Sequence, residues 1–309
     1  MLPLDHATSP LLLARRRRRA LGPTLEAYLY LLPALVILGV FTIGPIAYIV
    51  FLSLHSWTGT ASNLPWAGLS NFASLLHDTD FANSLVVTAL YILGTVPVGL
   101  ALALALALLL FARLPGMAVF RLAVLMPYVT PVVSTSIIWL WIFNTNYGLL
   151  NYLLSLLSLP PVDWLGSSHW ALVAVIIYSL WHEVGFTVVI LLAGLTTIPG
   201  DLKEAARIDG AGDWQEFRHV VWPLMTPWLF FVVLITMIGA FKTFTQVYVL
   251  TGGGPANATN VTGYFVYKQA FQYFQISYAS TVSVVLFIII AALAAVQYLL
   301  GRQRVFYQQ

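Results

Sequence analysis

Long apolar stretches without Asp, Glu, Lys or Arg dominate this chain, and most match the thickness of a membrane. A helix needs about 20 predominantly apolar residues to cross the ~30 Å hydrocarbon layer of a bilayer. The stretches predict six membrane-spanning helices, at residues 28–53, 83–112, 118–143, 170–193, 223–250 and 278–300. Helix breakers inside the first three predict kinks there: Pro33, Gly44, Pro45, Pro97, Pro127 and Pro131.

The composition supports an all-α membrane protein and excludes a water-soluble enzyme. The chain of 309 residues is 60% hydrophobic and only 8% charged, whereas a soluble domain carries roughly 25% charged residues. This much apolar surface also excludes a disordered protein. The sequence has no cysteine, so thiolate catalysis, thiolate metal sites and disulfides are excluded.

The basic residues predict the orientation in the membrane. Twelve of the 14 Lys and Arg fall on one side of the six spans: Arg15–Arg19, Arg113, Arg121, Lys203, Arg207, Arg218, Arg302 and Arg304. Because basic loops stay in the cytoplasm, both termini are predicted to be cytoplasmic. We interpret the run 15–19 as a topology anchor at the lipid surface. Nucleic-acid binding and a twin-arginine export signal are the alternatives, but the apolar run that follows is too long for a signal peptide.

The loop between the fourth and fifth spans is unusually charged. Residues 201–218 read DLKEAARIDGAGDWQEFR and hold five of the 11 acidic residues. Asp201 with Glu204, and Asp213 with Glu216, have the spacing of capping boxes. The pattern predicts two short helices that meet at an angle around Gly210 and Gly212.

Four apolar side chains of this loop still have to be covered. From the pattern alone, their burial against the membrane helices and their burial against a partner protein are equally acceptable. They are Leu202, Ile208, Trp214 and Phe217.

This loop resembles the EAA loop of ATP-binding-cassette importer permeases. That pattern is EAA, three residues, Gly, nine residues, an aliphatic residue, one residue, then Leu-Pro. The matching positions are Glu204, Ala205, Ala206, Gly210, Val220 and Pro223, with Trp222 in place of Leu. Three more stretches resemble the sugar branch, which serves maltose-type oligosaccharides and glycerol-3-phosphate: FTIGPIAYIVFLSLHSW, FNTNYGLLNYLL and FKTFTQVYVLTGGGP.

The resemblance implies a type I importer permease bundle in the bacterial inner membrane. It implies a basic tail at 1–26, a permease region at 27–304 with its core at 80–301, a coupling loop at 199–222 and a short tail at 305–309. It also implies that a second permease, two ATP-binding subunits and an extracytoplasmic sugar-binding protein complete the transporter. ATP and Mg would be bound by the partner ATPase, so this chain needs no cofactor, metal or catalytic residue of its own. The residues expected to couple to the ATPase are Glu204, Ala205, Ala206, Asp209, Gly210 and Gly212.

Polar residues within the spans are candidates for a substrate path. His182 and Glu183 lie in the middle of the fourth span, where an ionisable group costs at least ~2.5–3.5 kcal/mol. A packing role is the alternative for both. Lys242 either pairs with Glu183 or extends to the membrane surface. Thr245 and Gln246 offer neutral donors and acceptors that suit sugar hydroxyls.

Two further features complete the expectations. The resemblance implies an outer gate or binding-protein contact at Gly252, Gly253, Gly254 and Pro255. The membrane tryptophans, such as Trp139, Trp141 and Trp170, are expected to be anchors at the lipid–water interface.

Two other functions compete with the importer. An ion-coupled secondary carrier would use His182, Glu183 and Lys242 as a relay. An intramembrane metalloenzyme would use His182 and Glu183, but adjacent helical residues point about 100° apart and are poor joint ligands.

Overall fold

The computed structural model describes residues 26–57, 59, 63–111 and 115–301. The basic run Arg15–Arg19, Arg113, Arg302 and Arg304 lie outside these residues, so the predicted orientation stays a prediction. Within the described ranges the chain is nearly all helical, with a single isolated β-bridge between His55 and Trp66.

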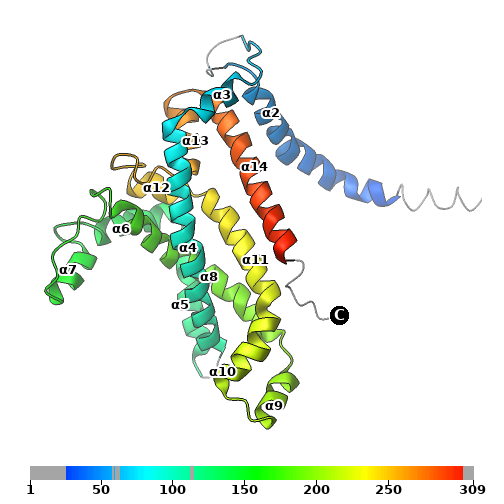
Figure 1. The fold of residues 1–309 in the computed structure, drawn as a ribbon, viewed down its shortest axis with the longest axis vertical. Helices are drawn as coiled ribbons and strands as arrows, with labels where there is room; N and C mark the ends of the chain where they lie inside the picture. The colour runs from blue at the N-terminus through cyan, green and yellow to red at the C-terminus, as the bar shows by residue number, and fades with distance from the viewer. Residues whose placement is uncertain (1–25, 58, 60–62, 112–114, 302–309) are drawn as a thin grey trace, which may run out of the picture.

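Thirteen labelled α-helices are linked by loops and three π-helical turns in this part of the chain (Figure 1). The helices are α2 (Gly44–Ser53), α3 (Ser70–Leu76), α4 (Thr79–Phe111), α5 (Met117–Val129), α6 (Val132–Ile142), α7 (Leu149–Leu156), α8 (Ala171–Thr196), α9 (Gly200–Ile208), α10 (Asp213–Glu216), α11 (Trp222–Phe241), α12 (Thr245–Leu250), α13 (Thr262–Tyr267) and α14 (Ile276–Gly301). The π-helical turns are Gly39–Ile43, Phe217–Val221 and Lys268–Gln272.

Five of the predicted spans are continuous helices in the described residues. They are Glu26–Ser53, Thr79–Phe111, Ala171–Thr196, Asp213–Phe241 and Ile276–Gly301. The third span is a broken pair, α5 and α6, whose axes differ by 98°. The six predicted spans are therefore confirmed when the broken pair is counted as one.

The break in the third span occurs at Thr130 and Pro131. Thr130 ends α5 in an extended conformation and Pro131 precedes α6. Proline removes a backbone donor and disfavours a helical conformation in the residue before it. The predicted kink at Pro131 is thus a near right angle, whereas Pro127 and Pro97 lie inside α5 and α4.

The prediction that the fifth span runs on to residue 250 is wrong. α11 ends at Phe241, and a separate short helix, α12, begins at Thr245. Between them the Thr243 side chain donates to Tyr91 in the bundle, and Gly263 approaches the Thr243 carbonyl so closely that a Cβ would collide with it. These contacts hold the chain in a turn at Lys242–Phe244.

Helices α4, α8 and α11 form the centre of the molecule. Small residues of α4, Ala103 and Ala107, pack with Leu191 of α8 and Met225 of α11 in one apolar core. A second core surrounds Tyr91 and Tyr178 and includes Trp139, which is only 9% exposed. The expectation that Trp139 is an interface anchor is therefore wrong, because its ring packs against Phe143 and Tyr178.

The first span lies at the edge of the fold. Figure 1 shows it running away from the other helices, and its side chains are almost all exposed. Only its end, α2, is fastened to the bundle. The backbone of Trp57 exchanges hydrogen bonds with Ser277 at the start of α14, and Asn71 donates to the carbonyls of Ser53 and His55.

Candidate functional site

The charged loop forms the short helix α9 and the first turn of the fifth span, α10, at one end of the molecule. α9 and α10 project at the bottom of Figure 1, opposite α3 and α13. They are joined by Asp209–Gly212, so the predicted glycine corner is confirmed. The second helix is not a separate short one, because α10 continues through the π-helical turn Phe217–Val221 into α11 as the single span Asp213–Phe241.

Gly210 makes the corner possible. It has a φ of +83°, a left-handed conformation that favours glycine. The Ala211 amide donates to Ala206 and the Gly210 amide donates to Arg207, both across the end of α9. This is the Schellman arrangement, in which a left-handed residue satisfies the last carbonyls of a helix.

The two predicted capping boxes are wrong in detail. α9 begins at Gly200 after Pro199, so Asp201 lies in the first turn, where its charge favours the helix N-terminus without capping it. α10 begins after Gly212, whose amide donates to the Gln215 side chain at 2.9 Å. Only this half of a capping box exists, because glycine has no side chain to complete it.

Glu216 has a different role from the predicted cap. It is buried, and its carboxylate accepts a hydrogen bond from Arg207 Nε at 2.9 Å. Since Arg207 belongs to α9 and Glu216 to α10, this ion pair links the two helices across the corner.

The apolar side chains of the corner divide into two groups. Phe217 packs on the core of α4, α8 and α11. Ile208 is 81% exposed and Trp214 is 68% exposed, and Leu202 is exposed as well. The corner therefore presents bare apolar side chains on both sides of Gly210, at the end of the molecule.

Gly212 differs from Gly210. Its φ is −76°, which any residue adopts, and a Cβ there would meet nothing within 4 Å. Nothing within the described chain requires glycine at this position. Glu204, Ala205 and Asp209 are exposed on the same short helix pair, and Ala206 is half-buried.

In the bundle, His182 lies beside the break between α5 and α6. Its Nε2 is 3.3 Å from the carbonyl oxygen of Thr130, the residue that ends α5. Its ring stacks on Tyr178, whose hydroxyl donates to Val132 O and contacts Thr135 Oγ1. His182 thus contacts the Thr130 carbonyl, which the end of α5 leaves without a helical partner, and Tyr178 ties the first turn of α6 to α8.

A glycine allows this approach. A Cβ on Gly185 would collide with the carbonyl oxygen of Val124, so α5 and α8 cross at backbone contact. This close crossing brings His182 to Thr130 and stacks Phe186 on Tyr128, with ring centroids 4.7 Å apart.

A polar network joins α4, α8 and the turn after α11. The buried Tyr91 hydroxyl donates to Ser179 at 2.8 Å, and it accepts from Thr243 at 3.3 Å and from Gln246 at 3.4 Å. Gln246 was predicted as a path residue from its residue type. Tyr91 was not predicted, because its hydrogen-bond partners come from distant parts of the chain.

A cavity of about 280 Å³ lies between this network and the break. Ligand pockets are typically about 300–1,000 Å³, so the cavity is near the lower limit. Its polar lining includes Glu183, Thr187, Thr236 and Gln246, and its aromatic lining is Tyr128, Tyr178 and Phe186. Glu183 has no hydrogen-bond or ion-pair partner among the residues that the structure describes.

Lys242 does not approach this cavity. It is exposed, it ends α11 and it does not line the cavity. In the described part of the chain no interaction joins it to Glu183, and Thr245 at the start of α12 is half-buried outside the lining. The structure thus brings together His182, Glu183 and Gln246 of the predicted path residues, but not Lys242 or Thr245.

The predicted outer gate is a tight loop. Gly252 and Gly253 have φ values of +57° and +78°, and a Cβ on Gly253 would collide with the Tyr264 ring. The Thr259 hydroxyl donates to Gly254 O at 2.8 Å. Asn257 contacts Asn83 and Asp80, so the loop is tied to the first turns of α4.

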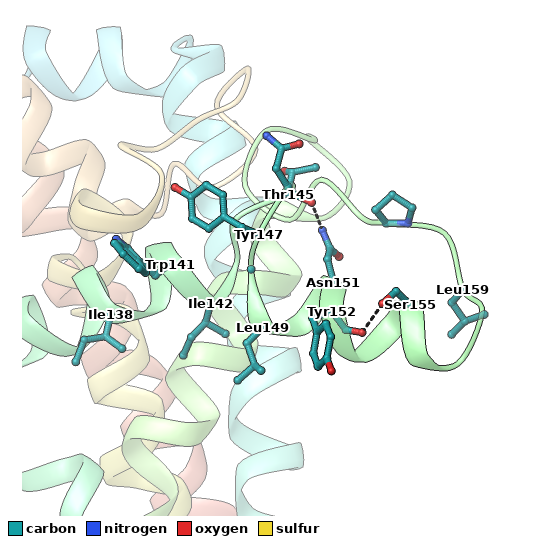
Figure 2. Close-up of a pocket in the computed structure, with 13 residues that line it drawn as sticks. Ile138, Trp141, Ile142, Thr145, Tyr147, Leu149, Asn151, Tyr152, Ser155 and Leu159 are labelled. Atoms are coloured by element: carbon teal, nitrogen blue, oxygen red, sulfur yellow. Dashed lines mark hydrogen bonds between the residues drawn. The ribbon is translucent and has the colours of Figure 1, made fainter.

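A second hollow, of about 810 Å³, lies between α6 and α7 (Figure 2). Asn151 organises it: its amide donates to Thr145 O and Val162 O, and its oxygen accepts from Val162 N and Trp164 Nε1. Trp141, Tyr147 and Tyr152 are exposed around it. For Trp141, this exposure agrees with the expected interface anchor.

The sequence matches one family of membrane proteins across the coupling loop and the cavity. Residues 95–305 match the model of the family described as "Binding-protein-dependent transport system inner membrane component". The chain belongs to this family. The permease is thus a multi-pass inner-membrane protein and a component of binding-protein-dependent transport.

Characterised relatives cover almost the whole chain. The trehalose/maltose transport system permease protein MalF of Thermococcus litoralis is 35% identical over 90% of this permease and 94% of its own length. The sulfoquinovosyl glycerol transport system permease protein SmoG of Agrobacterium fabrum is 33% identical over 89% and 90%. Both are named as permease subunits of transport systems.

A solved structure has the same fold. A chain of the bacterial alginate ABC transporter, in complex with an alginate pentasaccharide-bound periplasmic protein, aligns over 92% of this permease and 96% of its own length. The TM-score is 0.78 at 19% identity. The type I ABC importer permease fold expected from the sequence is confirmed.

Proposed function

We propose that this permease imports a sugar or sugar derivative, delivered by an extracytoplasmic binding protein and driven by ATP hydrolysis in separate subunits. The observation that carries the proposal is the exposed apolar corner at Ile208 and Trp214, whose two helices are joined by the Arg207–Glu216 pair. A partner protein would bind the exposed apolar side chains of this corner. Because α9 is ion-paired to α10, and α10 continues into α11, a movement of the corner would be passed on to α11. In this reading both termini and the corner are cytoplasmic.

The matched relatives support the sugar as cargo. Their names specify trehalose/maltose, sulfoquinovosyl glycerol and sn-glycerol-3-phosphate, and the aligned structure contains an alginate-bound protein. The cavity has the chemistry that a sugar needs: hydroxyl, amide and carboxylate groups together with the stacked rings of Tyr128 and Phe186. The second permease, the two ATPase subunits with ATP and Mg, and the gate role of Gly252–Pro255 belong to the same proposal.

The docking step is tested with Ile208→Asp. A buried, unpaired carboxylate is unfavourable at an apolar contact, so we expect at least a tenfold loss of the ATPase subunit that co-purifies with the permease. The matched control is Leu76→Asp, because Leu76 is 84% exposed and lies on α3 at the opposite end. Equal retention of the ATPase in both variants would reject docking at this corner.

The cavity is tested with Glu183→Gln and Glu183→Leu. The amide keeps hydrogen bonds to sugar hydroxyls, so Glu183→Gln should keep uptake within about threefold of the original permease. Leucine removes these bonds and should reduce uptake about tenfold or more. Uptake is measured with labelled sugar in proteoliposomes. Loss of all transport in Glu183→Gln would instead indicate that the carboxyl group carries a proton, as in an ion-coupled carrier.

A further inference from the structure

A third hollow, apart from the central cavity and next to the coupling corner, lies where α4 and α8 end. It has a volume of about 820 Å³, and its lining includes Arg121, Lys203, Thr196 and Thr197 together with apolar side chains such as Phe111 and Leu192. These residues come from α4, α5, α8, the turn after α8 and α9. Because α4 and α8 are membrane spans, the hollow lies near one membrane surface.

The charge in this hollow has one sign. Among the described residues two cationic side chains line it and no carboxylate does, whereas the adjoining hollow at the corner is lined by Glu204, Asp213 and Glu216. Neither Arg121 nor Lys203 forms an ion pair with any residue in the described ranges. The nearby acids Asp201 and Glu204 belong to α9, but neither belongs to the lining.

The two cations are held in place by contacts that leave donors free. Arg121 donates through Nε and Nη2 to the carbonyl of Leu110, in the last turn of α4, at 3.2 and 2.8 Å. A guanidinium has five N–H donors, so three remain. The Lys203 ammonium lies 4.7 Å from the centroid of the Phe111 ring, and a cation over a ring keeps its donors free for an anion.

The neighbouring surface is apolar. Leu109 of α4, and Phe120 and Leu122 beside Arg121 on α5, are all exposed. A basic hollow at the end of membrane helices next to bare apolar helix surface matches both parts of an anionic lipid, the phosphate headgroup and the acyl chains.

We propose that Arg121 and Lys203 form a binding site for an anionic phospholipid, with the phosphate in the hollow and the chains along α4 and α5. The site does not depend on which substrate the permease carries. By contacting α9 it also links the lipid to the coupling corner, because Lys203 precedes Glu204 in the same helix.

Native mass spectrometry of the purified transporter in detergent tests the proposal. The probes are dioleoylphosphatidylglycerol and dioleoylphosphatidylcholine. We expect more bound phosphatidylglycerol than phosphatidylcholine. In Lys203→Gln we expect a loss of about fivefold in phosphatidylglycerol binding, which is the contribution of one Lys or Arg near the surface to the binding of anionic lipid. Lys203 is the better target, because Arg121 also caps α4.

The matched control is Arg218→Gln. Arg218 is an exposed cation beside α10 and does not line the hollow. Equal losses in both variants would show general surface attraction and would overturn the site, as would unchanged binding in Lys203→Gln. Displacement of the lipid by excess inorganic phosphate would reassign the hollow to a small free anion. Loss of the ATPase subunit from Lys203→Gln with lipid binding intact would reassign the cations to a protein partner.

Discussion

Replacing Gly210 with tryptophan is expected to abolish transport while the permease still inserts and folds. The left-handed conformation at φ +83° costs any L-residue about 1–2 kcal/mol, which a membrane bundle of this size tolerates. A Cβ at Gly210 meets nothing within 4 Å, so the corner has room for an indole, which would add bulk close to Ile208 in the sequence. In the proposed transporter it would prevent docking of the ATPase.

Two measurements separate these effects. Size-exclusion chromatography of the detergent-purified protein reports folding, and substrate-stimulated ATP hydrolysis in proteoliposomes reports coupling. The expected loss of stimulated hydrolysis is at least tenfold, as for a contact worth about 1.4 kcal/mol or more.

The chain offers a close control in Gly116→Trp. Gly116 has a φ of +81°, its Cβ would meet nothing within 4 Å, and it lies next to α5 rather than in the corner. The control shares the backbone strain and the added bulk, so it should transport normally. Normal transport by Gly210→Trp would contradict the docking role of the corner.

The largest expected effect on stability is that of Gly185→Leu. At this position α8 touches the backbone of α5, and a Cβ would collide with the Val124 carbonyl and approach Leu125 Cα at 3.0 Å. Backbone atoms cannot turn away as a flexible side chain can. The two helices would have to separate, so we expect a loss of about 3 kcal/mol or more in the free energy of unfolding.

Thermal unfolding of the purified protein, followed by tryptophan fluorescence, measures this effect. The control is Gly239→Ala in α11, where a Cβ would meet nothing within 4 Å. Alanine in an open helical position is favoured over glycine by about 1 kcal/mol, so the control should be equally stable or more stable. A Gly185→Leu protein with an unchanged melting temperature would show that the α5–α8 crossing adapts.

The sequence leaves the role of His182 open, and the helix crossing at Gly185 resolves it. An ionisable residue within a span indicates either function or packing, and the residue type does not distinguish them. In the fold, His182 faces the carbonyl that the break at Thr130 leaves free, which is a packing contact. Glu183, its neighbour in sequence, lines the same cavity as His182 but has no such backbone partner in the described chain, because successive helical residues face different directions.

The sequence by itself determined the number of spans, the corner at Gly210 and the family, because these depend on local composition and short-range spacing. The length of an apolar run shows whether it can span the membrane, and a left-handed turn after a helix favours glycine. Proline predicted a kink in the third span, but only the tertiary structure decided its 98° bend, the early end of α11 and the Tyr91 network. Each depends on contacts between residues far apart in the chain: His182 with Thr130, Gly263 with Thr243, and Tyr91 with Gln246. Backbone groups freed inside a membrane need partners from other helices, and the order of the residues does not show which helix supplies them.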